Sequence, residues 1–539
     1  MGSQILLYVL IALLIDTIRA ADHLKYGSSK KYTAKNMSPE HTTEYWNEKA
    51  QDILKQKLVQ VQSPITNNAK NIIMFLGDGM SVHTVTATRN FMGDSAKQIS
   101  FEKFPYFGLS KTYCVDSQVA DSACSATAYL GGVKGNYGTI GVNANVPRFD
   151  CMAGLNVGNW VESIAQWAQN AGMDTGLVTT ARVTHASPAG VYAHTAQRGW
   201  ENDAEILKSD CSPKVNVDIA RQLVEWPVGR KLKVIMGGGR SNFRNVTVID
   251  EDGIAGQRYD GRDLIEYWIQ DKRSQNVKAN YVWNRKGLNS LNLNNTDYLL
   301  GLFSSSHCPF HGDLKRNNIS TLVPSLSEMT ESALKVLSKK NNGFFLFVEG
   351  ARIDMAHHET KARKSLEDTE EFAKAVDLTR KMFSEEDTLI IVTSDHSHTM
   401  TISGYPYRDE DITGLAADQA DDDLPYTILS YANGPGFENT YDKKGRKRIN
   451  PEETIDPNFQ YLATVPLASE THGGDDVGVF ASGPFAHYFS GTYEQSNIPA
   501  MMAKAANIGT FKSAAGVHAR PTVMALFIIH FFIILLKIR

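Results

Sequence analysis

The sequence lacks an apolar run long enough to cross a bilayer comfortably, because a spanning helix needs about 20 such residues. The first run, ILLYVLIALLI at residues 5–15, is shorter, begins near the N-terminus and is followed by Ala20 and Ala21. This order predicts a signal peptide over residues 1–20. Because MGSQ before the run carries no positive charge, a short N-terminal membrane anchor is the alternative.

The last apolar run, residues 523–536, is also short and is interrupted by His530. Small residues from Ser513 onward and a polar spacer precede it, which is the order of a lipid-anchor attachment signal. We therefore expect a glycolipid (GPI) anchor on Ser513, removal of residues 514–539 and a cell-surface location on the outer leaflet of the plasma membrane. Basic residues at the very end are unusual in a removed tail, so a single-pass helix is the alternative.

The chain has no strong excess of charge, with 55 Lys and Arg against 59 Asp and Glu and a net charge of −4. This balance excludes the basic footprint of a protein that binds nucleic acid. No internal repeat or long low-complexity tract is present either. Four Asn-X-Ser/Thr triplets suit glycosylation in the secretory route. They begin at Asn36, Asn245, Asn294 and Asn318.

Cysteine is scarce and its count of five is odd, so at least one cysteine is unpaired or bonded elsewhere. Polar, loop-like sequence flanks Cys151 and Cys211, which favours a disulfide between them. Cys124 lies within a run of small residues, and we expect a buried thiol there. The sequence does not decide the pairing of Cys114 and Cys308.

From residue 71 onward, the sequence alternates short apolar runs with amphipathic stretches. The runs NIIMFL, TGLVTT, KVIM, FFLFV and TLIIVT are typical of buried strands, and one helix between them opens with a Ser-x-x-Glu capping box at Ser325. This alternation predicts an α/β fold with a large, mostly parallel central sheet and helices on both faces. Residues 403–471, rich in Gly, Pro and Asp, predict a loop-rich insertion.

Polar side chains follow four of these strands at the point where each strand ends. They are Asp78, His185 with Ser187, Glu349, and Asp395 with His396 and His398. One such residue is usually a turn or a helix cap. Right-handed crossovers, however, bring the carboxyl ends of parallel strands to one edge of the sheet, where ligands bind. Four strands that deliver such groups together therefore predict a functional site.

The spacing Asp354-x-x-x-His358 places a carboxylate and an imidazole one turn apart on one helix face. Alone, such a pair is more often a surface contact, but here it follows Glu349 closely at a strand end. Carboxylate and imidazole groups suit zinc. His472, beside two glycines that let the backbone come close, can complete the site.

Further ligand types predict two more ions. Asp395 and His396 are adjacent and can hold a second zinc. Three residues offer only oxygen and suit magnesium, namely Asp78, Ser187 and Glu349. Two metal ions about 4 Å apart clamp the attacking and leaving oxygens of an in-line phosphoryl displacement. A bidentate arginine is the natural additional phosphate ligand, and Arg198 is the candidate, although a loop arginine is usually only a surface residue.

The stretch VADSACSATAYLGG, residues 119–132, places one Asp–Ser pair at the head of a run of small side chains. We expect Ser122 to be the nucleophile and a metal ion to activate it. We also expect Ser122 to lie at a helix N-terminus, where the backbone N–H groups face the phosphate. The small neighbours let metal ions and substrate approach. Taken alone, the stretch fits a helix cap with tight packing equally well.

These motifs resemble those of the metazoan alkaline phosphatases. FLGDGM, DSACSATAYLGGVKGNYGTIGV, TTARVTHASPAGVYAHT, FFLFVEGARIDMAHHE, TSDHSH and ETHGGDD occur in the family's order and at its spacing, and the resemblance spans about Tyr45 to Asn507. It implies a catalytic domain over residues 43–510, with residues 403–471 as the crown at a dimer interface. It also implies a homodimeric, glycolipid-anchored hydrolase of phosphomonoesters with two zinc ions and one magnesium ion per subunit.

The resemblance also implies a role for each residue singled out above. The first zinc binds Asp354, His358 and His472, and its water hydrolyses the phosphoserine formed on Ser122. The second zinc activates Ser122 and binds Asp78, Asp395 and His396. Magnesium binds Asp78, Ser187 and Glu349. Arg198 binds the phosphate, and the supporting residues are Asp121, His185 and His398.

Two departures from the family pattern bear on function. Met355 stands where relatives usually have His beside the phosphate, and a thioether cannot donate a hydrogen bond there, which puts the turnover and the pH optimum in doubt. Ser304 and Val323 stand at positions where mammalian members bind calcium through carboxylates, so we expect no calcium site of that type.

Two other classes of function compete with a phosphomonoesterase. A phosphodiesterase typically uses threonine, and a sulfatase needs a modifiable residue in another motif, so the metal set with Arg198 argues against both. A surface receptor or binding ectodomain with weak or no activity is the non-enzyme alternative. Loss of Ser122, Asp78 or His472 would favour it, and all three are present.

Overall fold

The computed structural model describes residues 38–93, 95–408, 410–417 and 419–511. The predicted signal peptide, Asn36, Ser513 and the C-terminal segment 514–539 lie outside the described residues. No helix in the described part of the chain combines the length and the apolar character needed to span a bilayer.

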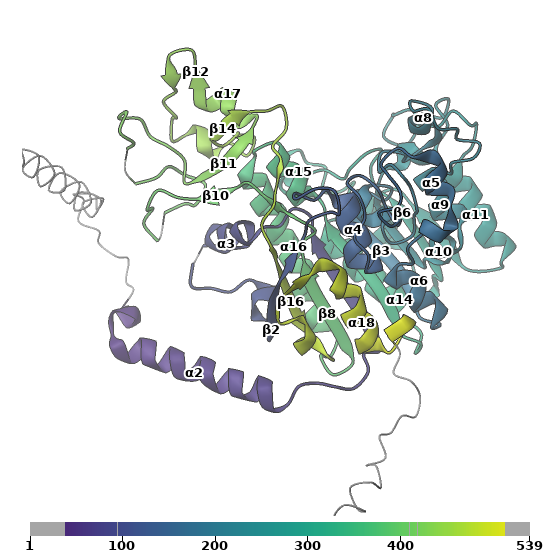
Figure 1. Ribbon diagram of the computed structural model, residues 1–539, viewed down its shortest axis with the longest axis horizontal. Coiled ribbons are helices and arrows are strands. Elements are labelled where there is room, and N and C mark those ends of the chain that lie inside the picture. The colour runs from purple at the N-terminus through teal and green to yellow at the C-terminus, as the bar shows by residue number, and fades with distance from the viewer. Residues whose placement is uncertain (1–37, 94, 409, 418, 512–539) are drawn as a thin grey trace, which may run out of the picture.

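Ten strands form one central sheet (Figure 1). In spatial order they are β17 (Gly491–Glu494), β2 (Tyr106–Lys111), β16 (Val477–Ser482), β8 (Thr388–Thr393), β1 (Asn71–Gly77), β7 (Phe344–Gly350), β3 (Asp174–Arg182), β4 (Val234–Gly238), β6 (Tyr298–Leu302) and β5 (Ala279–Val282). Within this sheet only β16 runs antiparallel to its neighbours, β2 and β8. The predicted α/β architecture with a mostly parallel sheet is therefore confirmed.

The strands at the centre of the sheet are apolar throughout because both of their faces are covered. All seven residues of β1 are buried. Its side chains alternate, so that Ile72, Met74 and Leu76 join one hydrophobic cluster while Ile73 and Phe75 join another on the opposite face. This two-sided burial explains the continuous apolar runs in the sequence.

Helices form a layer on each face of the sheet (Figure 1). One layer contains α4 (Ser122–Gly131), α6 (Ile164–Asn170), α9 (Ile219–Glu225), α10 (Pro227–Lys231), α11 (Leu264–Ser274) and α18 (Ile498–Ala506). The other contains α3 (Val82–Phe91), α12 (Arg285–Ser290), α13 (His311–Arg316), α14 (Leu326–Leu337) and α16 (Ala362–Met382). The predicted capping box at the start of α14 is present, since Ser325 accepts from the backbone of Glu328 and Glu328 accepts from that of Ser325.

Residues 403–471 form a small unit at the upper left of Figure 1 that is more ordered than a set of loops. Its elements include β11 (Leu429–Gly434), α17 (Gly436–Thr440), β12 (Tyr441–Asp442), β13 (Gly445–Arg446) and β14 (Ala463–Pro466), and β11 also pairs with β10 (Thr401–Ile402) just before the segment. A buried cluster that includes Ile428, Tyr431 and Tyr461 holds the unit together. Strands this short leave little periodicity in the sequence, which is why only an insertion was predicted.

The cysteines form two disulfides. One joins Cys151, at the start of α5 (Cys151–Leu155), to Cys211, the pair that the flanking sequence favoured. The other joins Cys114 to Cys124, so the expectation of a free thiol at Cys124 is wrong. The irregular segment after β2 brings the two Cα atoms to 5.8 Å, a proximity that the sequence pattern does not reveal. Cys308 is buried and unpaired.

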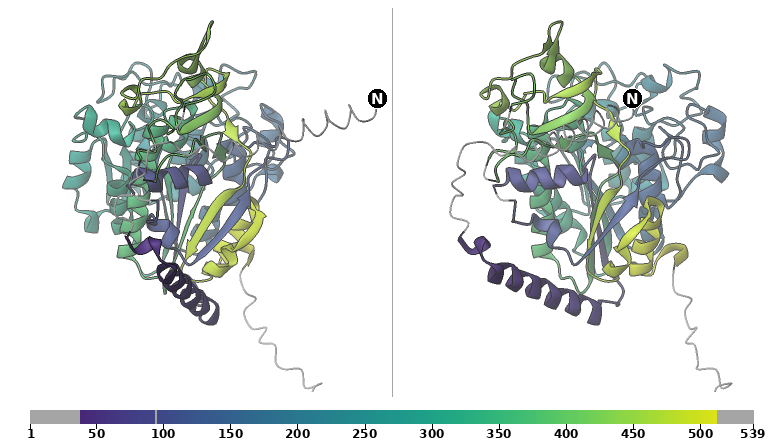
Figure 2. Two further views of the ribbon diagram at one scale, coloured as in Figure 1. Left: turned by 90° about the vertical axis from the view of Figure 1, so that its left-hand side faces the viewer. Right: turned by 60° about the vertical axis from the view of Figure 1, so that its left-hand side comes forward.

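The N-terminal helix α2 (Thr43–Gln62) lies along the outside of the molecule, below the sheet in both views of Figure 2. None of its residues is buried. Two of the predicted glycosylation acceptors, Asn294 and Asn318, are exposed, whereas Asn245 is half-buried and donates from its amide to the carbonyl oxygen of Arg258. Glycosylation stays a prediction at all of these positions.

Candidate active site

The predicted site residues gather at the carboxyl edge of β1, β3, β7 and β8. Leu76 at the end of β1 pairs with Glu349 on β7, and Glu349 pairs in turn with Thr179 on β3. On the other side, Leu76 pairs with Thr393 at the end of β8, shortly before Asp395. The parallel register therefore brings the four polar strand ends side by side.

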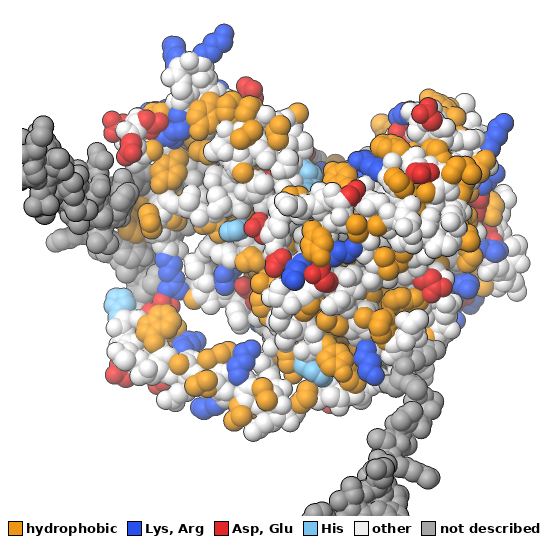
Figure 3. Space-filling view, in the orientation of Figure 1, with side chains coloured by type: hydrophobic (Ala, Val, Ile, Leu, Met, Phe, Trp, Pro, Cys, Tyr) orange, Lys and Arg blue, Asp and Glu red, His pale blue; other side chains and the backbone are white. Residues whose placement is uncertain are grey.

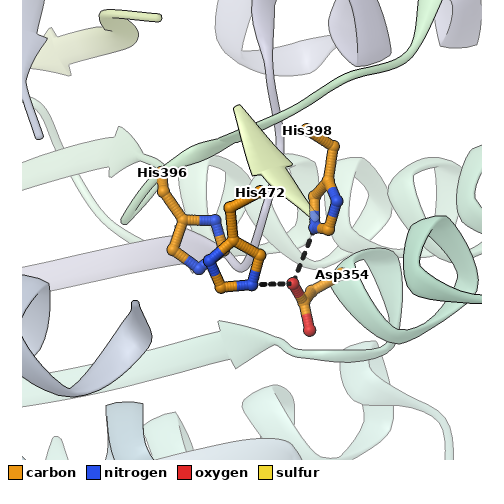
Figure 4. A group of neighbouring side chains, drawn as sticks. All are labelled: Asp354, His396, His398 and His472. Atoms are coloured by element: carbon orange, nitrogen blue, oxygen red, sulfur yellow. Dashed lines mark hydrogen bonds and ion pairs between the residues drawn. The ribbon is translucent and has the colours of Figure 1, made fainter. Parts of the chain in front are cut away.

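Asp354, His358 and His472 form the first ligand cluster. Asp354 and His358 lie one turn apart on α15 (Arg352–His358), and His472 begins the short strand β15 (His472–Gly473). Asp354 Oδ1 is 3.4 Å from Nε2 of each histidine, and the two Nε2 atoms are 3.1 Å apart. Figure 4 shows His472 and His398 both pointing at Asp354.

The tautomers of these two histidines suit a metal ion. His358 Nδ1 donates to the carbonyl oxygen of Glu470 over 2.5 Å, and His472 Nδ1 donates to that of Ala120 over 2.7 Å. Each Nδ1 therefore carries the proton, and both Nε2 lone pairs face the same point. Burial lowers the pKa of both histidines, which keeps them neutral as metal ligands must be.

Asp78, Asp395 and His396 form the second cluster. His396 Nε2 lies 3.1 Å from Asp395 Oδ2 and 3.6 Å from Asp78 Oδ1. The backbone N–H of Gly79 donates to Asp395 Oδ1 over 2.9 Å and fixes that carboxylate. Gly79 has φ +65°, and a Cβ there would lie 2.4 Å from the ring of His398, so the position requires glycine.

The third cluster consists of oxygen groups only. The carboxylate oxygens of Asp78, Glu349 Oε1 and the hydroxyl of Ser187 are buried without a hydrogen-bond partner among the described residues. Burial, reinforced by Asp395 and Asp354, raises the pKa of Asp78 well above its usual range, and burial raises that of Glu349 to about 8. Unpaired buried carboxylates are costly, and a hard divalent cation satisfies such oxygens. The donor set therefore fits a metal ion.

Ser122 is the first residue of α4, beside the second cluster. Asp121 caps the helix, since its Oδ1 accepts from the backbone N–H of Cys124 over 3.2 Å. Ser122 Oγ lies 3.2 Å from His396 Nε2. The small residues also serve packing, because a Cβ on Gly190 would lie 2.7 Å from Cβ of Ala126. The stretch is thus a capped, tightly packed helix start that also places a hydroxyl against the ligand cluster.

Arg198 reaches the same point from the loop after α7 (Ala186–Ala189). Its Nη1 donates to Asp121 Oδ2 over 2.9 Å, and its Nη2 donates to His185 Nε2 over 3.2 Å. Burial alone would raise the pKa of Asp121, but Arg198 and two backbone N–H groups lower it. Burial lowers the pKa of His185 well below its usual range, and nearby arginines add to this. His185 is therefore a neutral acceptor that helps to orient the guanidinium.

Two residues near the ligands were not predicted from the sequence. Glu470 is buried and accepts from Nδ1 of His398 over 2.5 Å, while Nε2 of His398 contacts Asp354 Oδ1 at 2.7 Å. Glu470 is the first residue of the ETHGGDD motif, so its closeness to His472 in the sequence could have indicated that it lies near the site. His307 packs edge-on against His185 with ring centroids 5.3 Å apart and contacts the Arg182 guanidinium, and no sequence pattern marks it.

Comparisons with known proteins agree with this geometry. A family model for alkaline phosphatase matches residues 69–508. The chain is 44% identical over 510 residues to a membrane-bound alkaline phosphatase of Bombyx mori, with 91% of each chain covered. It is 42% identical over 506 residues to the tissue-nonspecific alkaline phosphatase of Homo sapiens, covering 90% of this chain and 94% of that protein.

Solved structures show the same fold. An alkaline phosphatase of the Antarctic bacterium TAB5 aligns with a TM-score of 0.56 and 23% identity over 82% of this chain and 99% of that one. The Thermus thermophilus alkaline phosphatase aligns with a TM-score of 0.56 over 83% of this chain and 93% of that one. The chain therefore belongs to the alkaline phosphatase family and is an enzyme of that class.

Proposed function

We propose that Ser122 is the nucleophile of a phosphomonoester hydrolase that works through a phosphoserine intermediate. The observation that carries this proposal is the position of Ser122 Oγ, 3.2 Å from His396 Nε2 at the first turn of α4. The free N–H groups of that turn and the helix dipole favour a phosphate at this point.

The metal complement proposed is two zinc ions and one magnesium ion per chain. Zinc would be held by Asp354, His358 and His472 and by Asp78, Asp395 and His396, and magnesium would be held by Asp78, Ser187 and Glu349. When bound, such ions supply Lewis-acid stabilisation and lower the pKa of oxygen nucleophiles. The orphaned oxygens and the converging Nε2 lone pairs support this assignment.

The chain's own residues bind and orient the phosphate. Arg198 takes two phosphate oxygens with its guanidinium, while Asp121 holds that group through Nη1 and His185 supports it through Nη2. Ser122 gives up its hydroxyl proton to solvent and its Oγ attacks phosphorus in line with the ester oxygen, which leaves with the bonding electron pair and takes a proton from solvent. Water then attacks the phosphoserine, breaks the bond between Ser122 Oγ and phosphorus, and releases inorganic phosphate.

Catalysis in this scheme comes mainly from charge stabilisation. The transferring group spreads negative charge over three equatorial oxygens, and little acid–base work is needed. Arg198 and the N–H groups of α4 offer fixed positive charge where those oxygens must lie. In this scheme every one of these groups acts on the phosphate, so we expect a broad range of phosphomonoesters to be substrates.

The test compares two serine variants on the same helix. Ser122→Ala should lower kcat by about 10³-fold or more at alkaline pH. Ser125→Ala is the matched control, since Ser125 is equally buried but donates to the backbone of Asp121, and it should keep wild-type turnover. Brief reaction with substrate followed by acid quenching should yield a phosphopeptide at Ser122. Full activity of Ser122→Ala, or a phosphate on another residue, would refute the nucleophile assignment.

Elemental analysis of the same samples tests the metal assignment separately. Wild type, Ser122→Ala and Ser125→Ala should each carry two zinc ions and one magnesium ion per chain. A different stoichiometry in active enzyme would contradict the metal assignment while leaving the role of Ser122 intact.

We also propose that the enzyme is a homodimer and that residues 43–510 are its catalytic domain, with residues 403–471 at the interface. Apolar side chains on α2, among them Trp46, Leu54 and Leu58, are more than half exposed, and Figure 3 shows hydrophobic side chains along this helix. Such a row of exposed apolar side chains favours a protein partner, so α2 is proposed as part of the dimer interface as well. Light scattering should give twice the chain mass, and Leu54→Glu with Leu58→Glu should shift it towards the monomer.

A lipid anchor at Ser513 and a cell-surface location complete the proposal. The Bombyx mori relative is named a membrane-bound enzyme, which supports a membrane association here. Treatment of expressing cells with a phosphatidylinositol-specific phospholipase should release the activity into the medium. Activity that stays on the cells would favour the single-pass helix.

A further inference from the structure

We infer that the Cys114–Cys124 disulfide is a positioning device for the reaction centre, one that holds Ala120, Asp121 and Ser122 in place. The inference rests on the proposed role of Ser122. The bond joins the segment after β2 to the first turn of α4, and the reacting hydroxyl lies inside the ring that the bond closes.

The segment enclosed by the bond is irregular, and hydrogen bonds tie it to a neighbouring loop, since Val115 N–H donates to the carbonyl oxygen of Gly135 and Tyr137 N–H donates to Asp116 Oδ1. Residues 112–121 belong to no helix or strand, and the side chains of Val115 and Val119 are exposed by 55% and 37%. Cys114, Ala120 and Cys124 form a small buried cluster of their own, and Asp121 and Ser122 are buried beside it. Exposed irregular segments are the parts of a fold that open first. The covalent tie therefore adds restraint to a segment that otherwise depends on hydrogen bonds and a few buried side chains.

The restrained segment carries three separate functions of the site. The carbonyl oxygen of Ala120 accepts from His472 Nδ1 over 2.7 Å and so fixes the tautomer that leaves Nε2 free. Asp121 caps α4 and holds Arg198. Ser122 presents its hydroxyl to His396. One displacement of this segment would move a metal ligand, the phosphate-binding arginine and the nucleophile together.

The second disulfide provides a contrast within the same chain. Cys151 and Cys211 are 60 residues apart in sequence, against 10 for Cys114 and Cys124. Closing a longer loop removes more entropy from the unfolded chain, so the Cys151–Cys211 bond should contribute more to stability. The loop that it closes contains His185, Ser187 and Arg198, but neither cysteine is next to them in the chain, and Ala186 and Ala189 of the helix that follows His185 are buried in the main hydrophobic cluster. Loss of the Cys114–Cys124 bond should therefore lower turnover more than stability, whereas loss of the Cys151–Cys211 bond should lower stability more than turnover.

The experiment compares Cys114→Ala/Cys124→Ala with Cys151→Ala/Cys211→Ala, both purified as metal-loaded enzyme. We expect the first variant to lose about tenfold or more in kcat and to release zinc to a chelator faster, with a small change in thermal midpoint. The second should show the larger fall in midpoint and the smaller fall in kcat. Folded Cys114→Ala/Cys124→Ala with wild-type kcat and zinc retention would overturn the inference.

Two further measurements keep the test decisive. Ser122→Ala is assayed in parallel, since a fully active Ser122→Ala would mean that the proposed function has failed rather than the positioning role. Wild-type enzyme is also denatured without reductant, alkylated and digested. A linked peptide pair containing Cys114 and Cys124, with Cys308 as the single alkylated cysteine, is expected. Alkylation of all three would overturn the inference even if the variants do not fold.

Discussion

The Nε2 atom of His398 lies 2.7 Å from Oδ1 of Asp354, so a carboxylate of the first ligand cluster is held by a histidine behind it. Burial alone would lower the pKa of His398, but Glu470 and Asp354 raise it to about 10. His398 is therefore positively charged at neutral pH, and Glu470 is the group that keeps it so. The proposed zinc site would therefore depend on a buried ion pair between His398 and Glu470, of which only His398 was predicted from the sequence.

Glu470→Gln should therefore weaken zinc binding without touching a ligand. Loss of the carboxylate lowers the pKa of His398, and the neutral imidazole holds Asp354 less firmly. Partners behind metal ligands are typically worth about 10- to 100-fold in affinity or activity. Competition with a zinc chelator measures the loss. Asp476→Asn, a change to a nearby half-buried carboxylate outside the site, is the control and should retain zinc. Equal zinc retention in both variants would contradict this reading.

Removal of the metal ions should destabilise the protein more at alkaline than at acid pH. Without cations, Glu349 has a pKa of about 8 against an ordinary value near 4.5, and burial is the main cause. A carboxyl group with a raised folded-state pKa contributes stability at low pH that is lost as pH rises through that value. Thermal midpoints of chelated and metal-loaded enzyme at about pH 6 and about pH 9 measure the difference.

Glu349→Gln tests the cause of that pH dependence. The amide removes the ionising group, so the chelated variant should lose less stability between the two pH values than the chelated wild type. An identical pH dependence in both chelated proteins would show that Glu349 is not the group responsible.

The sequence predicted which polar side chains gather at one edge of the sheet because that information is local to each strand end. Asp78, Glu349 and Asp395 each follow an apolar run directly, and the topology of parallel sheets does the rest. The Cys114–Cys124 bond could not be predicted from the sequence, because it depends on the path of an irregular segment after β2. Residues 403–471 were likewise predicted only as an insertion, since β12 and β13 have two residues each and β11 is only half-buried along its length, which leaves no clear periodic pattern.

Asp368 predicts a second pH effect away from the ligands. It lies buried on α16, where both of its carboxylate oxygens accept from the backbone N–H of His311, and burial raises its pKa to about 8. The wild-type protein should lose this group's contribution to stability as pH rises through about 8. Asp368→Asn should therefore have a higher thermal midpoint than wild type at about pH 9 and a similar one at about pH 5. A lower midpoint at alkaline pH would mean that Asp368 is charged and paired with Arg352.

Met355 offers the most direct test of how this chain departs from its relatives. Its Sδ lies 2.8 Å from Nη1 of Arg352, whose guanidinium stacks on Phe310 with 3.6 Å between Cζ and the ring centroid. The thioether gives this cation a weak acceptor and offers no donor to a phosphate.

Met355→His adds an imidazole whose pKa should fall below about 6.5, because Arg352 is next to it. At alkaline pH the ring is then neutral and its N–H can donate to the phosphate. A hydrogen bond to a charged group is worth about 1.5–3 kcal/mol, so kcat/KM should rise about tenfold. The pH–rate profile should also gain an ionisation on its acid side, while zinc content stays unchanged. Met355→Leu keeps an apolar side chain of similar size and should leave the profile as it is. If both variants share the wild-type profile, position 355 lies outside the reach of the phosphate, and the departure from the family has no catalytic consequence.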